Sequence, residues 1–238
     1  FGWILWSGLG NSHCSGIYLH YSLTLCFFQS ATLFCKRYFS RINQRIDTFM
    51  RYLNLKMYEE ADSYLKNAEK FMDSFDNDLK TNLLYSKALV LSGIGNIEES
   101  LKILKDVLEI YKKEGIFDGM LSVYMDMANI LVKSDRSKEA IEILKKAKDV
   151  ALKTRDKANL ADVYSFIGDV YELEEDLVKA CNYFLKAAES YIESGFFEGA
   201  AEILDKVEII LDELPRSSRR RIRKKVSELK EKIKFKAS

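Results

Sequence analysis

The chain has 238 residues, of which 47% are hydrophobic and 31% are charged, a composition that excludes a chain disordered throughout. One proline and 11 glycines exclude collagen-like and linker-dominated chains and argue against a turn-rich β-sandwich. The formal net charge is +1, so the overall balance predicts neither a nucleic acid nor a membrane as partner.

Charge is unevenly distributed along the chain. Residues 1–49 carry four basic and one acidic side chain, residues 50–215 carry 22 and 33, and residues 216–238 carry 11 and two. The sequence therefore predicts three parts: an apolar leader at 1–36, a mainly acidic body at 37–214 and a basic segment at 215–238.

The leader contains no Asp, Glu, Lys or Arg before residue 36. Its segment Ile17–Cys35 has 19 residues, 13 of them apolar or aromatic, and Lys36 and Arg37 follow at once. This length and basic flank are typical of a membrane anchor that holds the following domain in the cytoplasm. Because the first methionine is Met50, a segment upstream of the native start is the other interpretation, and both stay open.

Cysteine and histidine are too few and too scattered to predict a metal site. The chain has four cysteines and two histidines, and no two cysteines are arranged as C-x-x-C. We expect no metal, no cofactor and no disulfide framework. Cys181, which lies in an apolar pattern, is expected to be buried and inert.

The body begins near residue 37 with a helical stripe of apolar residues spaced by three or four: Tyr38, Ile42, Ile46, Phe49 and Leu53. From there a 40-residue repeat organises the chain. Three segments align, starting at Tyr85, Met125 and Ser165: YSKALVLSGIGNIEESLKILKDV, MDMANILVKSDRSKEAIEILKKA and SFIGDVYELEEDLVKACNYFLKA.

Apolar and small residues recur in columns of this alignment. The apolar columns are Leu84, Tyr124, Tyr164; Leu91, Leu131, Tyr171; and Leu104, Leu144, Phe184. The small columns are Ala88, Ala128, Gly168; Ser100, Ala140, Ala180; and Val107, Ala147, Ala187. We interpret the aromatic members as packing between stacked helices, and we expect Gly168 to face Ala180 where two helices approach closely.

Each repeat predicts two helices joined by a polar turn. The pattern favours a first helix over 118–134 and second helices over 137–154 and 177–194, with turns at 93–96, 134–137 and 174–176. Gly115 and Gly195 follow second helices, where a left-handed residue is expected.

These columns resemble the tetratricopeptide repeat family, whose signature is matched best by Tyr164, Ile167, Gly168, Tyr171, Ala180, Phe184 and Ala187. The resemblance covers residues 37–213. The repeat here has 40 residues rather than 34, and the family's closing proline is missing. The resemblance implies a right-handed α-solenoid of about five helix-turn-helix pairs that serves as an interaction scaffold.

The resemblance also implies a concave groove lined by outward residues of each first helix. The corresponding positions are Asn82, Tyr85, Leu89, Ser122, Met125, Asp126, Asn129, Asp162, Ser165, Asp169 and Glu172, continuing to Glu202 and Asp205. None of these positions is basic, so the acidic chaperone tails that some members bind are not expected. The expected partner is a protein segment, either a basic peptide or an amphipathic helix.

The basic segment predicts an amphipathic capping helix. Ile222, Val226, Leu229 and Ile233 form one narrow apolar stripe, and Glu208 replaces a small column residue, so the last pair should pack differently. An alternative role is binding of anionic lipid or nucleic acid. The residues that would do so are Arg219, Arg220, Arg221, Arg223, Lys224 and Lys225.

No catalytic motif is present. The chain lacks a Gly-rich phosphate loop, an H-E-x-x-H sequence and a G-x-S-x-G sequence. We expect a non-enzymatic adaptor without a small-molecule substrate.

Overall fold

The computed structural model describes residues 57–70 and 76–237. The chain divides into two units, Phe1–Tyr64 and Leu65–Ser238. Of the first unit only residues 57–64 are described, in the first part of α2 (Tyr58–Glu69). All nine regular helices of the described residues are α-helices, and these residues contain no β-strand. The predicted leader and the helix expected from residue 37 lie outside the described residues.

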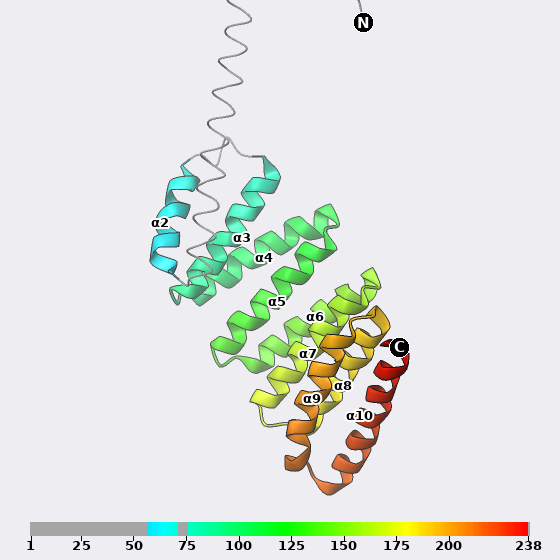
Figure 1. The fold of residues 1–238 in the computed structure, drawn as a ribbon. Helices are drawn as coiled ribbons and strands as arrows, with labels where there is room; N and C mark the ends of the chain where they lie inside the picture. Colours follow the sequence, from blue (N-terminus) through cyan, green and yellow to red (C-terminus); the bar gives the residue numbers. More distant parts are fainter. Residues whose placement is uncertain (1–56, 71–75, 238) are drawn as a thin grey trace, which may run out of the picture. The chain divides into compact units, whose positions relative to one another are not determined.

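The 40-residue period sets the helix boundaries in the second unit. First helices begin at residues 77, 117, 157 and 197: α3 (Asn77–Gly93), α5 (Phe117–Lys133), α7 (Lys157–Leu173) and α9 (Phe197–Ile210). Second helices begin at 97, 137 and 177: α4 (Ile97–Glu114), α6 (Ser137–Thr154) and α8 (Leu177–Ser194). Successive helices pack against one another (Figure 1), and the predicted α-solenoid is confirmed.

The backbone conformation of the turns also repeats every 40 residues. Within each pair a left-handed residue occupies the same repeat position, namely Gly95, Asp135 and Glu175. Between pairs the equivalent position holds Gly115, Arg155 and Gly195, also left-handed. The sequence correctly predicts Gly115 and Gly195 here, whereas Arg155 adopts this conformation without the conformational freedom of glycine.

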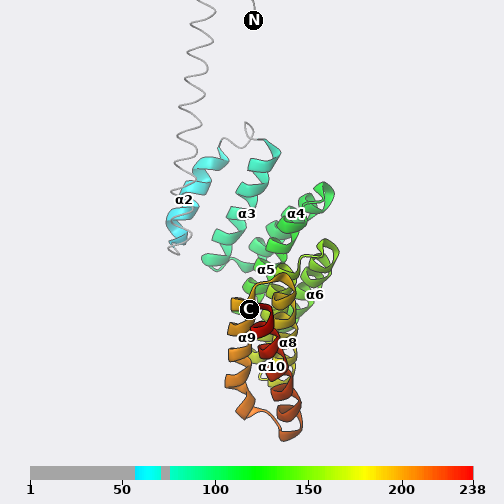
Figure 2. The same cartoon turned by 45° about the vertical axis from the view of Figure 1, so that its right-hand side comes forward.

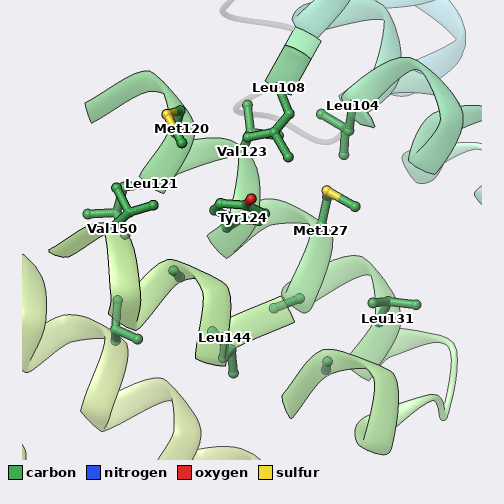
Figure 3. Packing of buried hydrophobic residues seen from close by; sticks show 14 of the residues in the cluster. Leu104, Leu108, Met120, Leu121, Val123, Tyr124, Met127, Leu131, Leu144 and Val150 are labelled. Atoms are coloured by element: carbon green, nitrogen blue, oxygen red, sulfur yellow. The ribbon is translucent and has the colours of Figure 1, made fainter. Parts of the chain in front are cut away.

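The interior is built from the predicted columns. Leu104, Leu144 and Phe184 are fully buried, and Tyr124 is 6% exposed. Leu84 and Tyr164, which occupy the same column as Tyr124, are partly buried against the same cluster. Figure 3 shows side chains of α5 gathered with Leu104 and Leu108 of α4 and with Leu144 and Val150 of α6. Cys181 is fully buried, as expected, and burial raises the pKa of its thiol to about 11.

Small residues allow the close contacts between the two helices of a pair. Gly168 lies against the ring of Phe184, because a Cβ atom built on Gly168 would be 2.5 Å from Cε1 of Phe184. The Phe184 ring is thus the nearest side chain to Gly168, and it is a neighbour that the sequence analysis did not name. At the equivalent place in the first pair, the buried Ser100 hydroxyl donates to the carbonyl of Ala88 at 2.6 Å.

The last helix pair departs from the period. A short 3₁₀ turn, η2 (Leu211–Glu213), follows α9 and leads into α10 (Arg216–Ala237). Helix α10 packs against α8 and α9 (Figure 2) and buries Ile222, Val226 and Leu229. Glu208 is exposed and accepts a hydrogen bond from Lys230 of α10 at 2.8 Å, so a polar contact replaces the small-residue contact of the earlier pairs.

Candidate functional site: a pocket across three first helices

Two pockets contain residues that the sequence predicts to bind a partner; their volumes are about 430 Å³ and about 330 Å³. The smaller one lies across α3, α5 and α7 and is called the α3–α5–α7 pocket below. Its lining residues are Tyr85, Leu121, Ser122, Met125, Asp126, Asn159, Asp162 and Val163. The repeat explains why they meet, because residues 40 positions apart occupy the same place on successive first helices. Ser122 and Asp162 are one such pair, and Tyr85 and Met125 are another.

Five of the thirteen predicted groove residues line this pocket: Tyr85, Ser122, Met125, Asp126 and Asp162. The pocket does not include the other eight, which are Asn82, Leu89, Asn129, Ser165, Asp169, Glu172, Glu202 and Asp205. Sequence reasoning missed Leu121, Asn159 and Val163. Leu121 and Val163 are buried, and the outward-facing pattern used for the prediction therefore excluded them.

Tyr85 and Asp126 form a hydrogen-bonded pair that bridges α3 and α5. The Tyr85 hydroxyl donates to Oδ2 of Asp126. Burial raises the pKa of Tyr85, and the hydrogen bond and negative charge of Asp126 raise it further. Burial also raises the pKa of Asp126, although the hydrogen bond from Tyr85 acts in the opposite direction. The tyrosine thus stays protonated as a donor and fixes the position of the carboxylate.

A second tyrosine fixes the other carboxylate of the pocket. The Tyr191 hydroxyl, on α8, donates to Oδ1 of Asp162 on α7. Burial and this hydrogen bond both raise the pKa of Tyr191. Sequence reasoning missed Tyr191 because it belongs to a second helix and lies 29 residues from its partner.

Lys206 compensates the negative charge of two predicted groove residues that lie outside the pocket. Its ammonium group, on α9, contacts Asp169 and lies 2.9 Å from Oε2 of Glu172, both on α7. Partial burial lowers the pKa of Lys206, but the hydrogen bonds to the two carboxylates outweigh burial and raise it overall. The ammonium group also lies 4.5 Å from the centroid of the Phe184 ring.

Lys206 is a basic residue beside the acidic positions predicted at the C-terminal end of the groove. Lys206 occupies the repeat position of Asp126, two repeats further along. Asp205 is also paired, because Lys230 of α10 donates to its Oδ1 at 2.8 Å. Of the predicted acidic residues, Asp126 and Asp162 are held by neutral tyrosine donors, whereas Asp169, Glu172 and Asp205 are neutralised by lysines.

The six predicted basic-tail residues all lie on α10, and four of them contact neighbouring segments. Arg223 lies 3.6 Å from Asp212 of η2. The Arg221 guanidinium donates to Asn182 at 3.3 Å, Lys225 pairs with Glu189 at 2.5 Å, and Arg219 donates to the backbone carbonyl of Leu214 at 2.9 Å. Arg219, Arg220, Arg223 and Lys224 line the hollow of about 430 Å³ together with Arg216 and Ser227.

No helix in the described part of the chain is both long enough and apolar enough to cross a bilayer. The anchor considered at Ile17–Cys35 lies outside those residues.

The paired helices, buried small-residue columns and constant 40-residue period define a helical repeat protein. Residues 119–193 match the family model of the tetratricopeptide repeat. The helix pairs of this segment are thus similar to tetratricopeptide repeats, and the same 40-residue period continues on both sides of it.

Solved structures with the same fold share little sequence with this chain. BtubC (BKLC) from P. vanneervenii has a TM-score of 0.51 at 17% identity, covering 75% of this chain and 79% of that chain. A Rap protein complexed with Competence and Sporulation Factor has a TM-score of 0.55 at 19% identity, covering 79% and 53%. The apo form of RapI has a TM-score of 0.55 at 15% identity, covering 74% and 55%.

This chain thus spans about half the length of the two Rap chains. At these identities the likeness concerns the fold. A comparison with curated proteins finds no match.

Proposed function

We propose that this protein is a non-enzymatic scaffold that binds a basic segment of a partner protein, with a lysine or arginine of that segment in the α3–α5–α7 pocket. The observation that carries the proposal is the placement of two carboxylates, Asp126 and Asp162, in one pocket with Leu121, Met125 and Val163. A long basic side chain has an aliphatic stem and a charged head, which suit apolar and carboxylate groups respectively.

Preorganisation supports the proposal. The two carboxylates are held by tyrosine hydroxyls from neighbouring helices, so little conformational entropy is lost when a cation binds. A neutral donor leaves the negative charge on the carboxylate, whereas Lys206 compensates the charges of Asp169 and Glu172. The partner's basic residues are therefore directed to the pocket and away from α9.

The family and its structural relatives favour an interaction role. Repeat arrays of this kind present extended binding surfaces, and the Rap structure of similar fold is a complex with Competence and Sporulation Factor. A membrane-tethered form of the same adaptor, with Ile17–Cys35 as anchor, is the alternative for the leader. It is tested separately by carbonate extraction of the expressed protein.

The test starts with selection of binding peptides from a random displayed library on the full chain. We expect the selected peptides to be enriched in lysine and arginine. Asp126→Asn combined with Asp162→Asn keeps both acceptors for the tyrosines but removes two charges. We expect this double variant to bind a selected peptide about tenfold more weakly, measured by fluorescence anisotropy, because two close charge pairs are lost.

A matched control is Asp106→Asn combined with Asp149→Asn, which changes the net charge equally on the exposed faces of second helices. We expect it to leave affinity within about twofold, since exposed charges outside the site act only weakly. Selection of acidic peptides, or equal weakening in both double variants, would show that the pocket is not the binding site.

A further inference from the structure

The hollow on α10 has features that its capping role does not require. It measures about 430 Å³ and is lined by Arg216, Arg219, Arg220, Arg223, Lys224 and Ser227. Five of these six side chains are cationic, and the sixth is Ser227, whose hydroxyl donates to the backbone carbonyl of Arg223 at 3.2 Å. None is aromatic, so the hollow offers no ring for stacking, and its apolar surface comes from the aliphatic stems of the arginines and the lysine.

The packing of α10 fixes the direction in which these cations point. Ile222, Val226 and Leu229 are 1–2% exposed against α8 and α9, which prevents the helix from rotating about its axis. Residues 216, 220, 223 and 227 follow one another by four, three and four positions, so they form one stripe on a helix. The stripe therefore remains directed away from the buried face.

Carboxylates near the hollow compensate only part of this charge. Asp212 lies 3.6 Å from Arg223 and 3.9 Å from Arg219, and its side chain is 84% exposed. Glu228 lies 3.8 Å from Lys224. Within the described part of the chain, no carboxylate is within ion-pair distance of Arg216 or Arg220. Like charges thus remain side by side, an arrangement that an added anion would stabilise.

The arginine side chains that line this hollow suit phosphate oxygens, since guanidinium groups bind phosphate in a bidentate manner. The volume suits a few phosphate groups rather than an extended duplex, and the lack of aromatic side chains disfavours stacked single-stranded bases. We propose that this hollow binds a small polyphosphate anion, either free in solution or as the headgroup of a phosphorylated lipid. This site is independent of the α3–α5–α7 pocket.

The experiment titrates the full chain with inorganic tripolyphosphate by isothermal calorimetry at fixed salt. Arg216→Gln combined with Arg220→Gln removes the two cations that lack carboxylate partners, and we expect binding to weaken at least about tenfold. Lys232→Gln combined with Lys234→Gln removes equal charge from exposed positions nearer the C-terminal end of α10, and we expect a change of no more than about twofold. Asp212→Asn should tighten binding, because it removes a competing carboxylate.

A second arm distinguishes the sources of the anion. Flotation with phosphatidylcholine vesicles that contain 5% phosphatidylinositol bisphosphate assigns the site to a lipid headgroup if the protein floats and the Arg216–Arg220 double variant does not. Binding of tripolyphosphate without flotation assigns it to a free polyphosphate. Three results would each overturn the proposal. They are absence of tripolyphosphate binding, an equal loss of affinity in the two double variants, and tight binding of a 20-base-pair duplex only.

Discussion

Complementary residue sizes hold each helix pair together. Repeat positions that carry Ala88 and Leu104 in the first pair carry Gly168 and Phe184 in the third. The larger phenylalanine ring takes the space that the missing Cβ atom of Gly168 leaves. One residue thus compensates the other, and the period is preserved although both side chains change.

Gly168→Ala is therefore expected to destabilise the fold by about 1–3 kcal/mol, because the new Cβ atom would lie 2.5 Å from the Phe184 ring. Urea denaturation followed by circular dichroism measures the effect. Adding Phe184→Leu to this variant recreates the alanine–leucine pair that the chain uses at Ala128 and Leu144. The double variant should be more stable than the sum of the two single changes implies; strict additivity would contradict the contact.

The left-handed backbone conformation after each second helix is unfavourable for any residue other than glycine. Gly115 and Gly195 adopt it freely, whereas Arg155 has φ of 57° and carries the steric penalty of a Cβ atom. The sequence alone predicts a left-handed conformation at the two glycines but not at Arg155. Arg155 occupies the same repeat position, but arginine, unlike glycine, does not indicate this conformation.

Arg155→Gly should stabilise the protein by about 0.5–1 kcal/mol, since relief of strain exceeds the added entropy of the unfolded chain. Thermal unfolding by calorimetry would show a higher midpoint. Lys153→Gly, two residues earlier in the last turn of α6 and also exposed, serves as control and should lower stability by about 0.5–1 kcal/mol. A lower midpoint for Arg155→Gly would mean that its side chain stabilises the turn.

At the scale of elements, α10 ends the stack by burying its apolar stripe against α8 and α9. The sequence predicts this stripe from spacing alone, because helical periodicity determines which residues share a face. The polar contacts from Lys230 to Asp205 and Glu208 were not predicted, because they depend on how α10 crosses α9.

Leu229→Ala should lower the free energy of unfolding by about 2–5 kcal/mol, because Leu229 is 1% exposed and its loss leaves a cavity. Hydrogen exchange should show reduced protection of backbone amides first in α9 and α10, since a repeat contacts only its neighbours. Phe235→Ala on the same helix is the control. Phe235 is 83% exposed, and we expect its replacement to change the free energy of unfolding by no more than about 0.5 kcal/mol. Equal effects of the two changes would contradict the capping role.

At the scale of the whole array, function arises from side chains brought together by the period. The fold was predictable because apolar and small residues recur at the same repeat positions, and these are the positions that are buried. The pocket was predictable only in part, since Tyr85 and Asp126 are 41 residues apart and Tyr191 and Asp162 are 29 apart. Whether such pairs form depends on side-chain direction across helix contacts. Counting acidic residues in the sequence therefore overestimated the free negative charge near α9.

The most direct test of the binding proposal locates the bound peptide by photocrosslinking. A photoreactive phenylalanine replaces Ser122 in the pocket, or Lys146 on the exposed face of α6 as control. With a library-selected basic peptide, we expect mass spectrometry to find a crosslinked product from position 122 and none from position 146. Crosslinking at position 146 alone would contradict binding in the α3–α5–α7 pocket.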